Sequence, residues 1–215
     1  MKNFILLIAL TLTTAACSQA GINQITTADL DKGIIDKGSP ADLDKGVKAY
    51  ENRDYSTALA EFYPLAKQGN TIAQNGIANM YYYGEGISQD YKQAAKWYKL
   101  AAEQGDAHAQ YNLGVMYDEG LGVPQNYNQS FNWFYLSARQ GEVDAQYNLA
   151  RMFALGLGTA QNFSNSYIWF KIAGDGGDKD ADRNRRNAAR FMTAAQIIES
   201  RELAIQCLAN NYKGC

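Results

Sequence analysis

The sequence predicts an all-α fold, an α-solenoid of stacked antiparallel helical hairpins. One pattern is written three times at a spacing of 36 residues between residues 73 and 180, and such a period is typical of repeat proteins whose units stack on their neighbours. Within each copy, apolar residues recur at intervals of three and four, which indicates two amphipathic helices. The columns that set the register are Ala73, Ala109 and Ala145; Met80, Met116 and Met152; Gly84, Gly120 and Gly156; Gly86, Gly122 and Gly158; Trp97, Trp133 and Trp169; and Gly105, Gly141 and Gly177.

Length and composition limit the classes of protein to consider. The chain has 215 residues, enough for one medium domain, and a formal net charge of -2 with both signs interspersed. A nucleic-acid partner is excluded because it would need a basic face. The 15 Tyr, 8 Phe and 3 Trp predict a core filled largely by aromatic rings. None of the three prolines falls in a strongly periodic segment, so long helices are expected.

Residues 1–16 have the features of an export signal, with a lysine near the start and a short apolar run. The segment from Thr14 to Cys17 resembles a bacterial lipobox, although the family pattern has leucine where Thr14 stands. A lipidated Cys17 would anchor the protein to a membrane by its acyl chains, and Ser18 after it, by resemblance to sorting rules, indicates the outer membrane. Cleavage after Ala20 and an uncleaved tail are the alternatives. We therefore expect an exported protein in the periplasm or at the cell surface.

Residues 17–38 are interpreted as a linker, and residues 39–72 as a divergent N-terminal capping repeat. The hexapeptide Ala-Asp-Leu-Asp-Lys-Gly occurs at 28–33 and again at 41–46, and we assign it no function. Ser39 is expected to cap a helix with Pro40 in its first turn, ending near Asn52. A second helix is expected from Tyr55 to Lys67.

The full repeats are residues 73–108, 109–144 and 145–180. Asn126, like its equivalents Asp90 and Asn162, is expected to cap the second helix of its repeat. The small column of Ala78, Gly114 and Ala150 is expected where helices approach closely, and the tryptophans are assigned to packing between repeats.

Residues 181–215 form a partial repeat and a C-terminal capping helix. Ala181 still falls on its column, and a capping box from Thr193 to Gln196 is expected to open the last helix. Cys207 and Cys215 are the cysteines that remain when Cys17 is lipidated, and an exported protein meets oxidising conditions. We predict that these two cysteines form a disulfide.

The repeat columns resemble the Sel-1-like repeat family, which is related to the tetratricopeptide repeat. The shared pattern is A-x3-[LI]-[GA]-x-M-[YF]-x2-G-x-G, followed by [DN]-[YF]-x5-W. The resemblance implies a right-handed superhelix that serves as an adaptor for protein complexes, often in bacterial envelopes. By analogy with the tetratricopeptide groove, the concave face should bind a protein partner through Asn75, Asn79, Tyr82, Tyr83, Tyr111, Val115, Asp118, Tyr147 and Arg151, beside His108, Glu119 and Asp144.

Catalysis is not expected, because groups that could act together as nucleophile, base or metal ligand are scarce. His108 is the only histidine, and no serine has lysine three residues later. We expect a monomeric, non-catalytic scaffold or adaptor of the cell envelope with no cofactor and no metal. A secreted or surface-exposed factor that binds host proteins is the alternative. Penicillin binding or β-lactamase-like activity, associated with cysteine-rich relatives, is implied by family resemblance alone.

Overall fold

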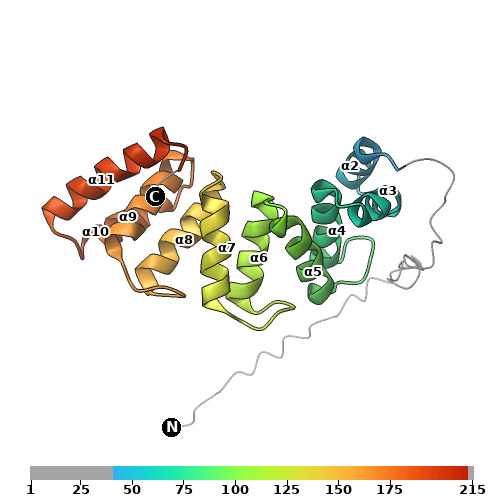
Figure 1. Cartoon of the computed structure of the whole chain (residues 1–215), viewed down its shortest axis with the longest axis horizontal. Coiled ribbons are helices and arrows are strands. Elements are labelled where there is room, and N and C mark those ends of the chain that lie inside the picture. Colours follow the sequence, from blue (N-terminus) through green and yellow to red (C-terminus); the bar gives the residue numbers. More distant parts are fainter. Residues whose placement is uncertain (1–40, 213–215) are drawn as a thin grey trace, which may run out of the picture.

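The computed structural model describes residues 41–212, which form a single row of helices (Figure 1). From α2 to α10 each helix packs against the next one in the chain, so that they form antiparallel hairpins, and α11 packs against α9. The described residues contain no strand, which agrees with the predicted all-α solenoid. The helices are α2 (Leu43–Glu51), α3 (Tyr55–Lys67), α4 (Thr71–Tyr83), α5 (Tyr91–Glu103), α6 (Ala107–Glu119), α7 (Tyr127–Ala138), α8 (Val143–Leu155), α9 (Phe163–Asp175), α10 (Ala181–Ala189) and α11 (Ala194–Ala209).

Side-chain caps and left-handed glycines set the ends of the helices. The predicted caps of the second helices are confirmed: Asp90, Asn126 and Asn162 each accept a backbone N–H from the first turn. Asn70 and Asp106 cap α4 and α6 in the same way. The first helices end at glycines whose φ angles of 71° to 73° suit a residue without a side chain.

The second glycine of each loop lies against the preceding repeat. Gly122 has a φ of +70°, and a Cβ added there would overlap the backbone carbonyl of Tyr91 at the start of α5. Gly158 lies in the same way against Tyr127 at the start of α7. The loops that contain Gly122 and Gly158 therefore come into backbone contact with the preceding repeat, which larger residues would prevent.

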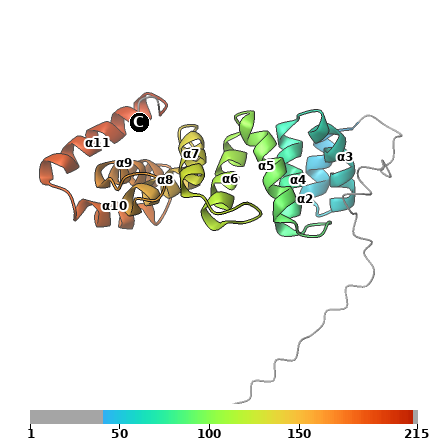
Figure 2. The same cartoon turned by 60° about the horizontal axis from the view of Figure 1, so that its bottom comes forward.

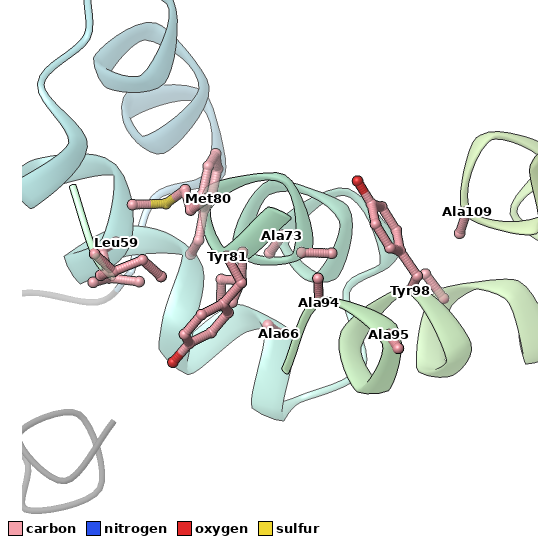
Figure 3. Packing of buried hydrophobic residues seen from close by; sticks show 14 of the residues in the cluster. Leu59, Ala66, Ala73, Met80, Tyr81, Ala94, Ala95, Tyr98 and Ala109 are labelled. Carbon is pink, nitrogen blue, oxygen red and sulfur yellow. The ribbon is translucent and has the colours of Figure 1, made fainter. Parts of the chain in front are cut away.

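Rings and small residues fill the core (Figure 3). Ala78, Gly114 and Ala150 are buried as predicted, and a Cβ on Gly114 would meet the ring of Phe134 at 2.7 Å. Figure 3 shows Tyr98 lying between Ala95 and Ala109, at the junction of two repeats. The position after each tryptophan holds a fully buried ring, whereas two of the tryptophans are only half-buried. Trp97 and Trp133 still pack against the core, and the Trp97 ring lies 6.2 Å from that of Tyr63 in the preceding repeat. The assignment of the tryptophans to packing therefore agrees with the structure, and Tyr98, Phe134 and Phe170 are the buried rings beside them.

Buried glutamines join successive hairpins, a feature that the sequence analysis missed. The side-chain amides of Gln74, Gln110 and Gln146 donate to backbone carbonyls eight residues earlier, at 3.1 to 3.2 Å. Two of these glutamines also accept a hydrogen bond at 2.8 Å from a glutamine in the turn after the next helix. Because an unpaired amide is costly to bury, these bonds help to fix the turn at the end of each second helix.

The opening repeat differs from prediction at the start of its first helix. The first helix begins at Leu43, with Asp42 as its cap, rather than after Ser39. Asp42 can cap because its side chain accepts the N–H of Lys45 at 3.1 Å. The second helix, α3, has the predicted bounds and contains Pro64; the helix continues because only one hydrogen bond, to the carbonyl of Ala60, is removed.

The C-terminal helix α11 packs against α9 at the end of the row (Figure 2). Its predicted capping box is confirmed, since Thr193 and Gln196 exchange side-chain to backbone hydrogen bonds. The chain then returns toward the turn after α7, where the Nε of Arg139 donates to the carbonyl of Tyr212 at 3.4 Å. Cys207 is buried in α11; its proposed partner Cys215 lies outside the described residues, so the disulfide stays a prediction.

The signal segment, Cys17 and the linker also lie outside the described residues. Within residues 41–212, none of the helices combines the length and the apolar character needed to cross a bilayer.

Candidate binding face

The predicted binding residues lie on α4, α6 and α8, at four positions that repeat every 36 residues. We call these positions the first-helix stripe. In α4 they hold Asn75, Asn79, Tyr82 and Tyr83; in α6, Tyr111, Val115, Asp118 and Glu119; and in α8, Tyr147, Arg151, Ala154 and Leu155.

At the N-terminal end, the stripe is a cluster of tyrosines. The rings of Tyr82 and Tyr83 meet edge to face with centroids 4.9 Å apart, and Tyr82 contacts Tyr91 in the same way. Asn79 accepts a hydrogen bond of 2.5 Å from the hydroxyl of buried Tyr98. Tyr82 and Asn79 therefore support the fold, while 63% of the surface of Tyr83 is exposed.

In the middle of the stripe, Tyr111 and Val115 are half-buried. Both pack against the hydrophobic cluster of the C-terminal half, which includes Phe134, Leu149 and Phe170. The Tyr111 ring lies 5.9 Å from that of Phe134. Burial, reinforced by the negative charges of Asp144 and Glu142, raises the pKa of Tyr111 to about 12. Its hydroxyl is therefore neutral at physiological pH, where it can donate a hydrogen bond.

One ion pair crosses the stripe between repeats. Arg151 of α8 donates to Asp118 of α6 at 2.5 Å, with 31% and 17% of the two side chains exposed. The structure thus brings together two predicted residues that are 33 positions apart in the chain.

A cavity of about 470 Å³ lies beyond this pair, between α8, α9 and α10. Tyr147 and Arg151, both predicted, are part of its lining. Tyr147 is held in place by Asn184, which donates to its hydroxyl at 2.8 Å, and by the ring of Phe170 at 5.3 Å. The other lining residues are Ala154, Leu155, Gln161, Phe163, Asn187, Ala188 and Phe191.

The stripe continues beyond the third repeat, where no binding residue was predicted. Adding 36 to the α8 positions gives Arg183, Asn187, Arg190 and Phe191, on α10 or directly after it. The signal was present, because Ala181 occupies the first column of the same register. It was passed over because α10 lacks the apolar core residues of a full repeat.

The charge of the stripe changes along the row. Its α6 positions include Asp118 and Glu119, whereas its last two units hold Arg151, Arg183 and Arg190. His108 is exposed at the start of α6. Within residues 41–212 there is no group of three or more histidine, cysteine, aspartate or glutamate side chains placed to hold a metal ion.

Comparisons with known proteins agree with this architecture. The family model described as Sel1 repeat matches residues 71–106, 107–142 and 143–178, each beginning two residues before the boundary drawn above. A search of curated proteins gave no match.

Two solved structures resemble the chain. The Sel1 repeat protein from Oxalobacter formigenes is 29% identical, with a TM-score of 0.65, over 73% of this chain and 63% of that protein. The protein c5321, described as a protective antigen of uropathogenic Escherichia coli strains with an SLR fold, is 32% identical, with a TM-score of 0.64, over 73% of this chain and 34% of that protein. With three family repeats stacked as hairpins in its structure, the chain belongs to the Sel1 repeat family.

Proposed function

We propose that the protein is a non-catalytic scaffold of the bacterial cell envelope that binds a protein partner on the concave face, along the first-helix stripe. Sel1 repeats generally mediate interactions between proteins. The observation that carries the proposal is the contrast between two sets of columns. Core columns keep the same residue type in all three repeats, whereas the stripe changes from tyrosine to acid to arginine along the row.

The chemistry of the stripe fits a protein surface. Exposed aromatic rings and arginines are enriched where proteins bind one another, because they combine a large contact area with directed hydrogen bonds. Tyr83 supplies such a ring at one end, and Arg190 and Phe191 supply both groups at the other. The rigid hairpins hold these groups in fixed positions, which lowers the entropic cost of binding.

Site-specific photocrosslinking in intact cells tests the binding face. A photoreactive phenylalanine analogue would replace Tyr83 or Val115 in the stripe, and exposed Leu100 or Leu136 on the second helices as matched controls. We expect discrete protein adducts from the stripe positions and none from the controls. Equal adducts from both sets would show that the stripe is not the binding face, and no adduct from any position would contradict the scaffold function.

The envelope location rests on the signal-like residues 1–16 and on Cys17. Metabolic labelling with a palmitate analogue tests it directly. The wild type should incorporate the label and sediment with membranes, whereas Cys17→Ser should do neither. An unlabelled wild type in the soluble periplasmic fraction would favour cleavage after Ala20 instead.

A further inference from the structure

We propose that the cavity between α8, α9 and α10 receives a large apolar side chain from an acidic peptide segment of the partner protein. This inference rests on the proposed function, since it assigns one subsite of the first-helix stripe. The expected ligand is a peptide segment in which carboxylates flank one apolar anchor residue.

The walls of the cavity call for an apolar occupant. Phe163, Phe170 and Phe191 line it together with the aliphatic Leu155. Phe191 stacks on Phe163 with ring centroids 4.6 Å apart, yet 69% of its surface remains exposed. A volume of about 470 Å³ lies in the range of sites that enclose a ligand group. An inserted ring would cover these exposed aromatic surfaces, and such burial is the main source of affinity at interface hot spots.

The charges around the cavity favour carboxylates beside that anchor. Arg183 and Arg190 directly precede Asn184 and Phe191 in the chain, two residues that line the cavity. Arg190 is exposed and makes no ion pair within residues 41–212. Arg183 pairs only with Asp180, and both side chains are more than half exposed. Such a pair is weak and can be exchanged for a partner's carboxylate.

Polar groups at the rim can serve the peptide backbone. Asn187 lines the cavity, is exposed, and has both an amide donor and a carbonyl acceptor. Gln161 and Asn184 are already engaged, donating to the Ala154 carbonyl and to the Tyr147 hydroxyl. Exposed Glu119 on α6 would repel carboxylates at the other side of Arg151. The acidic segment is therefore expected to follow α10 instead of crossing toward α6.

Selection from a displayed library of random short peptides tests the proposal on purified protein comprising residues 18–215, which omits the predicted signal segment and Cys17. Ala154→Trp would fill the cavity, because Ala154 lines it and is partly exposed. Ala195→Trp adds the same ring at an exposed position of α11 and is the matched control. The wild type and Ala195→Trp should enrich peptides with an aromatic or large aliphatic residue next to aspartate or glutamate. Ala154→Trp should bind those peptides about tenfold more weakly or worse, as expected for a lost hot-spot anchor.

Two further variants keep the test decisive if Ala154→Trp folds poorly. Phe191→Ala removes an exposed wall of the cavity, and Ile198→Ala, exposed on α11, is its control. Arg190→Glu should weaken acidic peptides, and raised salt should weaken them for the wild type. Fluorescence anisotropy with the enriched peptides measures each effect.

The outcomes separate this inference from the proposed function. Enriched peptides that lack the apolar-acidic signature, or that bind Ala154→Trp and Phe191→Ala as tightly as the wild type, would overturn the cavity assignment. Failure to enrich any peptide above the level reached with Ala154→Trp would overturn it as well. If crosslinks from Tyr83 and Val115 persist in those cases, the stripe still binds a protein and only the subsite is wrong. If the crosslinks are also absent, the proposed function fails.

Discussion

Arg151 joins two repeats through Asp118, since its guanidinium on α8 donates at 2.5 Å to the carboxylate on α6. The pair is largely shielded from water and lies beside the cavity that Arg151 helps to line. The ion pair holds the Arg151 guanidinium in one orientation. It also neutralises the negative charge of Asp118 on α6, beside the arginines of the last two units of the stripe. Removing either partner should therefore affect both stability and binding.

Arg151→Ala should lower the free energy of unfolding by about 1 to 3 kcal/mol, because Asp118 would lose its charged partner while still mostly buried. A double-mutant cycle with Asp118→Ala should give a coupling energy near 1 kcal/mol. The matched cycle on the exposed Lys99–Glu103 pair should give about 0.3 to 0.5 kcal/mol. Urea unfolding measures all four free energies in each cycle. Equal coupling in the two cycles would show that shielding adds nothing to the Asp118–Arg151 pair.

Glu142→Asp should stabilise the protein. Asp106 and Glu142 begin α6 and α8 with nearly the same backbone angles, but only Asp106 accepts a hydrogen bond, at 2.8 Å from the N–H of Ala109. The glutamate at the equivalent position makes no side-chain cap. The shorter side chain should gain about 0.5 to 1 kcal/mol, and Asp106→Glu should lose a similar amount.

Thermal unfolding of both variants followed by circular dichroism checks the cap exchange. The two melting temperatures should move in opposite directions, each by about 1 to 4 °C for a chain of this size. A fall in both would mean that the local fit of each side chain, and not capping, decides the effect.

Gly122→Ala should be far more damaging than Gly105→Ala. Both glycines have positive φ angles, +70° and +94°, so both substitutions carry the strain of a left-handed conformation, about 1 to 2 kcal/mol. An added Cβ at Gly105 meets nothing within 4 Å, whereas at Gly122 it overlaps the backbone of Tyr91. The contact at Gly122 can be relieved only by separating two repeats.

Urea unfolding should thus show a modest loss for Gly105→Ala and a loss of at least about twice that size for Gly122→Ala. Similar losses would contradict the close approach of the loop to the preceding repeat.

The sequence predicts the hairpins well because their signals are local and repeated. Caps such as Asn126 and Asp90 and glycines such as Gly120 act within a few residues, so the 36-residue period exposes them. The sequence does not predict which side chains are fully buried where two repeats meet, because that depends on contacts between repeats. Trp133 and Phe134 are both aromatic neighbours on one helix, and only the packing decides that the phenylalanine is the fully buried one.

The candidate site was predicted in part for the same reason. Tyr147 and Arg151 were found from their columns, but the cavity they share requires α9 and α10 to pack beside α8. Phe191 and Asn187 were missed because α10 has too few apolar residues to be counted as a repeat. Its arginines follow the stripe register even so, which shows that the surface pattern continues where the core pattern ends.

Stability should fall at alkaline pH because buried tyrosines resist ionisation. Burial is the main cause that raises the pKa values of Tyr50, Tyr82, Tyr98 and Tyr111 above the usual 10.0, and that of Tyr111 reaches about 12. A raised pKa in the folded state means that the fold favours the neutral hydroxyl. The contribution of Tyr111 to the free energy of unfolding is therefore complete below pH 10. It is lost as the pH rises from 10 to about 12, because in this range the tyrosine ionises in the unfolded chain before it does in the folded protein.

Tyr111→Phe should remove part of this alkaline loss, because phenylalanine has no proton to release. The slope of unfolding free energy against pH, measured by urea titration between pH 10 and about 12, should be shallower for Tyr111→Phe than for the wild type. Tyr83→Phe, at an exposed position of the same stripe, should change the slope less than Tyr111→Phe does, because the charge of Tyr83 is only a minor cause of the raised pKa of Tyr111. If the two variants have equal slopes, then the half-buried setting of Tyr111 does not contribute to the alkaline transition. The loss would then come from the tyrosines packed around α4, and Tyr98→Phe would be the variant that reduces it.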